Sequence, residues 1–174
     1  MTVKQIISEI SKLPNSIRLI VITGGEPFRQ NLRPLLHEIL MLDNRLYVQI
    51  ETNGTFAPTS LRYNQNINER KGIYIVVSPK TKRINLLCAG EACAFKYVIE
   101  AGKINNKDGL PNSILGYEHE PARPIFFVNS RIYVLPLDSK NEALNSKNIQ
   151  EAISSSLNHG YNFQLQVHKI IGLE

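Results

Sequence analysis

The stretch Ile17-Arg-Leu-Ile-Val-Ile-Thr-Gly-Gly-Glu-Pro27 decides the fold, because an apolar run passes directly into two glycines and an acidic residue. Such an almost continuous apolar run is typical of a strand in a parallel sheet, with both faces covered. Glycine after a strand allows a tight turn and a close approach of the backbone to a ligand. We therefore expect a strand over 17–23 with a ligand-facing turn at its carboxyl end.

Further apolar runs alternate with helical patterns along the chain. The expected strands cover 17–23, 46–51, 72–78, 95–99, 131–135 and 162–166. Helices are expected where apolar residues recur at helical spacing, over 3–13, 30–42 and 141–157, with a short polar helix over 60–71. The alternation predicts an α/β fold with a mostly parallel sheet and right-handed crossovers. An open doubly wound sheet and part of a barrel both fit.

The composition suits one domain spanning 1–174. The 174 residues include 43% hydrophobic residues, and 20 Lys and Arg stand against 15 Asp and Glu. Residues 100–124, rich in glycine, proline, asparagine and charge, are expected to form a loop or insertion. No run reaches the roughly 18 apolar residues of a membrane span, and the N-terminus lacks a secretory pattern, so we expect a cytoplasmic protein without membrane contact. The spread of positive charge argues against nucleic-acid binding.

Polar and glycine residues follow several expected strands at the same end, where ligands of α/β sheets bind. The clusters are Thr23–Pro27, Glu51–Thr55, Ser78–Lys80, Pro136–Asp138 and Gln166–Lys169. Together they predict a ligand site, and Glu26 is suited to an ammonium group. Single clusters also have plainer explanations: a tight turn at Gly24, charge matching at a helix N-terminus by Glu26, or a solvated Lys80.

Cys88 and Cys93 are the two cysteines of the sequence. They are too few for a disulfide framework, or for an iron–sulfur cluster held by three or four thiolates of one chain. Their apolar surroundings predict buried free thiols. Dinucleotide fingerprints, phosphate loops, hydrolase nucleophile elbows and zinc motifs are missing from the sequence.

Several motifs stand in an order that one family shares: Val21-Ile-Thr-Gly-Gly-Glu-Pro27, Ile50-Glu-Thr-Asn-Gly-Thr55, Val77-Ser-Pro-Lys80, Phe95-Lys-Tyr-Val98, Tyr133-Val-Leu-Pro-Leu-Asp138, Gly160-Tyr161 and Gln166-Val-His-Lys-Ile170. In these motifs the chain resembles the radical S-adenosylmethionine (SAM) superfamily. More closely, it resembles the 7-carboxy-7-deazaguanine synthase family of the queuosine pathway. The GGEP motif indicates only the superfamily, whereas the Glu-Thr-Asn-Gly-Thr, Ser-Pro-Lys and closing Gln-x-His-Lys motifs together are much more specific to the family.

The resemblance implies a partial (β/α) barrel, a lyase of 7-deazapurine biosynthesis. Its reaction would convert 6-carboxy-5,6,7,8-tetrahydropterin to 7-carboxy-7-deazaguanine. The implied cofactors are SAM, a [4Fe–4S] iron–sulfur cluster and Mg²⁺, and the implied assembly is a homodimer. The implied SAM-binding residues are Gly24, Gly25, Glu26, Glu51, Ser78, Pro79, Lys80, Leu135, Pro136, Leu137 and Asp138. The implied substrate-binding residues are Thr23, His168 and Glu174.

The chain also departs from the family pattern. It starts at the helix before the GGEP strand, so we expect the first β-unit of the family fold to be missing. That unit carries the cluster cysteines and an Asp-Thr that helps to hold Mg²⁺, and Leu135 replaces a frequent Gln. We therefore expect a truncated chain that is inactive alone, with no catalytic or metal-binding residue of its own. The alternatives are a non-catalytic SAM- or pterin-binding regulatory module and a basic interaction protein that keeps only the scaffold.

Overall fold

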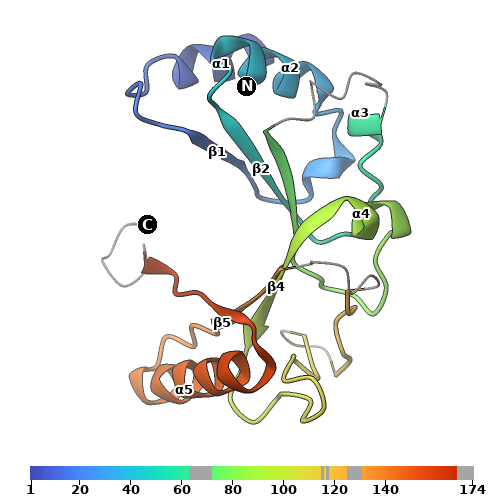
Figure 1. Cartoon of the computed structure of the whole chain (residues 1–174), viewed down its shortest axis with the longest axis vertical. Helices are drawn as coiled ribbons and strands as arrows, with labels where there is room; N and C mark the ends of the chain where they lie inside the picture. Colours follow the sequence, from blue (N-terminus) through green and yellow to red (C-terminus); the bar gives the residue numbers. More distant parts are fainter. Residues whose placement is uncertain (63–71, 115, 117, 125–130, 168–174) are drawn as a thin grey trace.

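A computed structural model describes residues 1–62, 72–114, 116, 118–124 and 131–167. Within them, six strands form one sheet in the order in which they follow along the chain (Figure 1). The strands are β1 (Leu19–Ile22), β2 (Tyr47–Thr52), β3 (Ile73–Val77), β4 (Ala92–Ile99), β5 (Arg131–Pro136) and β6 (Asn162–Phe163). All neighbours are parallel, which confirms the predicted α/β class. The strand order never reverses, so the partial barrel fits and the doubly wound alternative does not.

The helices largely follow the predicted pattern. They are α1 (Val3–Ile10), α2 (Arg33–Leu42), α3 (Thr59–Arg62), α4 (Leu86–Glu91) and α5 (Glu142–His159), with a 3₁₀ turn over Pro27–Arg29. A capping box at Thr2 and Gln5 starts α1. Gly160, with φ +70°, ends α5 in the left-handed conformation. The sequence analysis missed α4, and the predicted helix over 60–71 lies mostly outside the described residues.

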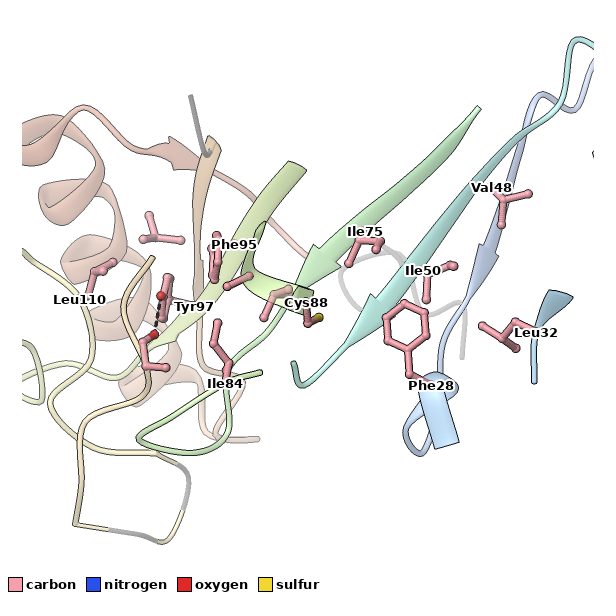
Figure 2. Packing of buried hydrophobic residues seen from close by; sticks show 14 of the residues in the cluster. Phe28, Leu32, Val48, Ile50, Ile75, Ile84, Cys88, Phe95, Tyr97 and Leu110 are labelled. Atoms are coloured by element: carbon pink, nitrogen blue, oxygen red, sulfur yellow. Dashed lines mark hydrogen bonds between the residues drawn. The ribbon is translucent and has the colours of Figure 1, made fainter. Parts of the chain in front are cut away.

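One hydrophobic core runs along one face of the sheet. Figure 2 shows Phe28 and Leu32 packing toward Val48 and Ile50 of β2. Along β2 the burial alternates: Val48 and Ile50 are fully buried, whereas Tyr47, the residue before Val48, is 46% exposed. The expectation that both faces of the strands are buried is therefore wrong for the first part of the sheet. The core lies on one face there, and the other face stays open.

The open face carries a row of side chains from adjacent strands. Leu19 and Val21 of β1 are 48% and 45% exposed, and their registered partners on β2 are Tyr47 and Gln49. Tyr74 pairs in register with Gln49, and its ring lies 5.9 Å from that of Tyr47. The strands thus present an accessible open face that extends to their carboxyl ends.

The segment 101–124, as far as it is described, is firmly attached although it forms only an isolated bridge between Ile104 and Pro111. Within the segment, the Arg123 guanidinium donates to Asp108 at 2.7 Å, and from outside it the Tyr161 hydroxyl donates to the Asp108 backbone carbonyl at 2.7 Å. The Tyr97 hydroxyl donates to the backbone carbonyl of Ala122 at 2.7 Å (Figure 2). These contacts make the segment a fixed wall beside the end of β4. None of the helices in the described ranges combines the length and apolarity needed to cross a bilayer.

Candidate ligand site at the carboxyl edge of the sheet

The turn after β1 is open to a ligand. Thr23, Gly24 and Gly25 are exposed. The two glycines have φ angles of +89° and +54°, which side-chain-bearing residues adopt at a cost. No heavy atom lies within 4 Å of the place that a Cβ would occupy on either glycine. Backbone groups of this turn are therefore accessible from outside.

Glu26 holds this turn to the neighbouring strand. The residue is only 8% exposed. Its Oε1 accepts a hydrogen bond from the Thr52 hydroxyl at 2.6 Å, and its Oε2 accepts one from the Asn53 N–H at 2.9 Å. The Phe28 N–H also donates to Oε1, at 3.2 Å, so Glu26 caps the 3₁₀ turn as the plainer explanation expected. A carboxylate has about four acceptor positions, so one remains on Oε2 among the described contacts.

Glu51, at the end of the apolar run of β2, is paired with a lysine of β4. The Lys96 ammonium lies 3.0 Å from Glu51 Oε1, and both side chains are mostly buried. The side-chain amide of Gln49 donates to the same oxygen at 2.8 Å. Gln49 and Glu51 lie on the open face of the sheet. The ion pair of Glu51 and Lys96 therefore belongs to the open face of the sheet and not to the core.

Ser78, Pro79 and Lys80 follow β3 beside the same edge. The Ser78 N–H donates to the Thr52 carbonyl at 2.8 Å, which continues the pairing with β2 one residue past the end of β3. Pro79 is buried and Lys80 is exposed. Partial desolvation, followed by repulsion from the Lys96 ammonium, lowers the pKa of Lys80. A bound anion would relieve this repulsion.

A pocket connects these residues to the end of β5 and to the attached segment. It is lined by Pro79, Lys80, Lys96, Tyr97, Val98, Glu100, Lys103, Pro111, Ser113, Ile114, Pro121 and Leu137. Lys103 is paired with Glu100 at 2.8 Å. The pocket thus combines apolar walls with lysine side chains, a composition that suits an organic anion.

The end of β5 forms a second hollow with α5. Pro136, Leu137 and Asp138 line it together with Asn145, Ile149, Leu165 and Gln166. Asp138 accepts hydrogen bonds from the Lys140 N–H at 3.0 Å and the Asn145 amide at 3.1 Å. Leu135 is 4% exposed, so its side chain contributes packing. His168 and Glu174 lie outside the described residues.

The structure brings most predicted SAM-binding residues to one edge of the sheet and adds others that the sequence analysis did not select. The added residues are Thr52, which bonds Glu26, and Lys96, which bonds Glu51. Thr52 belongs to the Glu-Thr-Asn-Gly-Thr motif, which already marked a strand end. Lys96 had a weaker signal, as a lysine within the apolar run of a strand.

The cysteines do not fit an iron–sulfur cluster. Cys88 is fully buried, and burial raises the pKa of its thiol to about 12, so it stays protonated at neutral pH. Cys93 is exposed, which corrects the expectation of two buried thiols, and its Sγ contacts the Ile75 carbonyl at 3.1 Å. Across the described ranges, no group of three His, Cys, Asp or Glu residues could hold a metal ion.

Known proteins resemble this chain over most of its length. It is 36% identical over 169 residues to the 7-carboxy-7-deazaguanine synthase of Rhodospirillum rubrum, covering 92% of this chain and 67% of that protein. It is 31% identical to the 7-carboxy-7-deazaguanine synthase of Rickettsia prowazekii, covering 94% of this chain and 63% of that protein. The chain therefore spans about two thirds of the length of these curated relatives. No protein-family model and no solved structure matches.

Proposed function

The chain belongs to the 7-carboxy-7-deazaguanine synthase family, and from this premise we propose that it binds SAM along the carboxyl edge of its sheet. The proposed activity of the whole protein is the radical rearrangement of 6-carboxy-5,6,7,8-tetrahydropterin to 7-carboxy-7-deazaguanine. This reaction belongs to the biosynthesis of queuosine and other 7-deazapurines. The observation that carries the proposal is the open turn at Gly24 and Gly25, next to a Glu26 carboxylate that keeps one acceptor position.

The residues at this edge match the charges of SAM. The exposed backbone of Gly24 and Gly25 gives the amino-acid part of SAM room to approach. The free acceptor position of Glu26 takes one N–H of the ammonium group. Lys80, for which no described carboxylate provides an ion pair, balances the carboxylate of SAM. Thr23 faces the pterin substrate. When bound, SAM supplies the radical chemistry of the family.

This chain alone does not supply the cluster that reduces SAM. A cluster takes three or four thiolates from one chain, whereas the sequence carries two cysteines, of which Cys88 is buried in the core. The described residues also include no group of three His, Cys, Asp or Glu side chains that could hold a metal ion. We therefore propose that the isolated chain binds SAM without cleaving it, and that residues outside this sequence hold the cluster.

Isothermal titration of the full chain with SAM, without iron, tests the binding proposal. Wild type should bind SAM, and Glu26→Gln should weaken binding about ten- to a hundredfold, because a charge-assisted hydrogen bond is lost. Glu142→Gln, at the exposed start of α5, is the matched control and should bind like wild type. A wild-type chain that releases no heat with SAM contradicts the proposal.

The cysteine arrangement also favours a second function, that of a non-catalytic module that binds SAM or the pterin. Supplying the cysteine-bearing segment of the family, fused to this chain, separates the two. If the fusion holds four irons and cleaves SAM with a reductant, the chain is the SAM-binding part of a synthase. If a folded fusion holds the iron but does not cleave SAM, the chain acts as a binding module.

A further inference from the structure

We propose that Thr52 is a positioning residue that fixes the Glu26 carboxylate and leaves it one acceptor position, suited to a single ammonium donor. This inference rests on the proposed SAM site and adds what selects the ligand there. Thr52 is the last residue of β2, and its side chain reaches Glu26 in the turn that follows the neighbouring strand β1. It was not among the residues that the sequence motifs selected for ligand contact.

The Thr52 hydroxyl has only one arrangement available. The residue is 3% exposed, so water does not compete for its hydrogen bonds. Its Oγ1 accepts the Gly54 N–H at 3.0 Å and donates to Glu26 Oε1 at 2.6 Å. A hydroxyl carries one proton, and because Gly54 occupies the acceptor side, that proton points to Glu26. The backbone turn at Gly54 thereby orients the bond to the carboxylate.

The hydrogen bonds that Glu26 already accepts limit how many more a ligand can donate to its carboxylate. Oε1 is filled by the Thr52 hydroxyl and the Phe28 N–H, and Oε2 accepts the Asn53 N–H. One position on Oε2 is left among the described residues. A guanidinium binds a carboxylate best through two parallel bonds to both oxygens, which this arrangement does not offer. An ammonium needs one such bond, so the site favours a primary amine.

Without the Thr52 hydroxyl, the carboxylate loses its shortest bond and the Gly54 N–H loses its acceptor. Only the Phe28 and Asn53 N–H groups then hold the carboxylate, at 3.2 and 2.9 Å, so the direction of its open acceptor position is less tightly fixed. The loss falls on ligands that use this position and spares ligands that do not. A purely structural role of Thr52 would instead weaken all ligands of the edge alike, because it would disturb the turn as a whole.

The experiment compares two ligands on three variants of the full chain by isothermal titration. SAM carries the ammonium, whereas 5′-methylthioadenosine shares its adenosyl and S-methyl groups but lacks the amino-acid part and the sulfonium charge. Thr52→Val removes the hydroxyl at nearly constant size, and Thr52→Ser restores it. Thr55→Val is the matched control, because the Thr55 hydroxyl donates to Asn53 Oδ1 at 2.6 Å in the same turn and does not contact Glu26.

We expect Thr52→Val to weaken SAM about tenfold and to leave 5′-methylthioadenosine within about twofold of wild type. Thr52→Ser should bind both ligands like wild type, and Thr55→Val should show no selective loss of SAM. Equal weakening of both ligands, or no weakening, overturns the role of Thr52 while the SAM site stands. A wild type that binds neither ligand overturns the proposed function, and this inference with it.

If Thr52→Val does not fold, the hydroxyl proton of Thr52 can be measured in the wild type and in a Glu26 variant instead. A hydroxyl proton held at this distance from a carboxylate exchanges slowly with water and gives its own proton NMR resonance. We expect that resonance for Thr52 in the wild type and its loss in Glu26→Ala. A hydroxyl proton of Thr52 that exchanges equally fast in both proteins contradicts the positioning role.

Discussion

Replacing Gly54 by alanine should destabilise the protein far more than the same change at Gly24. Gly54 has a φ of +80°, and a Cβ there would lie 2.8 Å from Val77 Cγ1 and 2.9 Å from Ile84 Cγ2. Both neighbours are buried in the core, Val77 completely, so neither can move aside freely. The left-handed backbone costs about 1–2 kcal/mol for alanine. Overpacking of the core adds about 1–3 kcal/mol.

The free energy of unfolding should therefore fall by about 2–5 kcal/mol in Gly54→Ala. Gly24→Ala is the matched control, because Gly24 also has a left-handed φ, +89°, but open space where its Cβ would lie. Its loss should stay near the backbone cost of about 1–2 kcal/mol. The same control should weaken SAM binding, because its methyl group occupies the approach to the turn.

Urea denaturation followed by circular dichroism measures both free energies of unfolding. Gly54→Ala should lower the midpoint with little change of the slope, since the surface exposed on unfolding is the same. Equal destabilisation by the two substitutions would refute the argument, because it would mean that the contacts of Gly54 with Val77 and Ile84 carry no cost. A stable Gly54→Ala protein would refute it as well.

Three further predictions concern other parts of the chain. A disulfide-exchange reagent at pH 8 should modify one thiol of the folded protein, that of exposed Cys93, and both thiols after unfolding; rapid modification of Cys88, whose pKa is raised to about 12, would contradict its burial. Arg123→Lys should lower stability by about 1–2 kcal/mol, because lysine cannot replace the two-pronged bond to Asp108. Hydrogen exchange at the Gly109 amide should then speed up, whereas exchange as slow as in wild type would show that the pair does not hold the segment. Burial raises the pKa of Tyr97 above its ordinary 10.0, so its contribution to stability is complete below about pH 10 and is lost as the pH rises through the folded-state pKa. The urea midpoint of unfolding should therefore decrease less from pH 8 to pH 11 in Tyr97→Phe than in wild type. An equal decrease in the two proteins would contradict this.

Strand positions could be predicted from the sequence because apolar runs are local signals. The run at Ile73–Val77 and the helix after Asn141 both formed close to their predicted bounds. The open face had a signal that was not used, since Gln49 and Glu51 alternate with Val48 and Ile50. Polar residues at every second position indicate a strand with one accessible face.

Other features depend on contacts that no local pattern contains. The short helix Leu86–Glu91 has few turns, and its best signal is Asn85, whose side chain accepts the Leu87 N–H at 3.0 Å. Thr52, the partner of Glu26, lies 26 residues further along the chain. The pair could therefore be identified only once the alignment of β1 with β2 was known. The accessibility of Cys93 depends equally on its place at the start of β4.

The order of the sheet has a consequence for how the chain folds. Because every described strand pairs with its neighbour in sequence, no strand has to wait for a distant segment before it can join the sheet. Parallel pairing is slow when it closes long loops, and here each closure spans only one crossover. The growing sheet can therefore assemble strand by strand during synthesis, from β1 onward. The long crossover between β4 and β5 leaves the two strands in parallel register along Ala94–Ile99 and Arg131–Pro136.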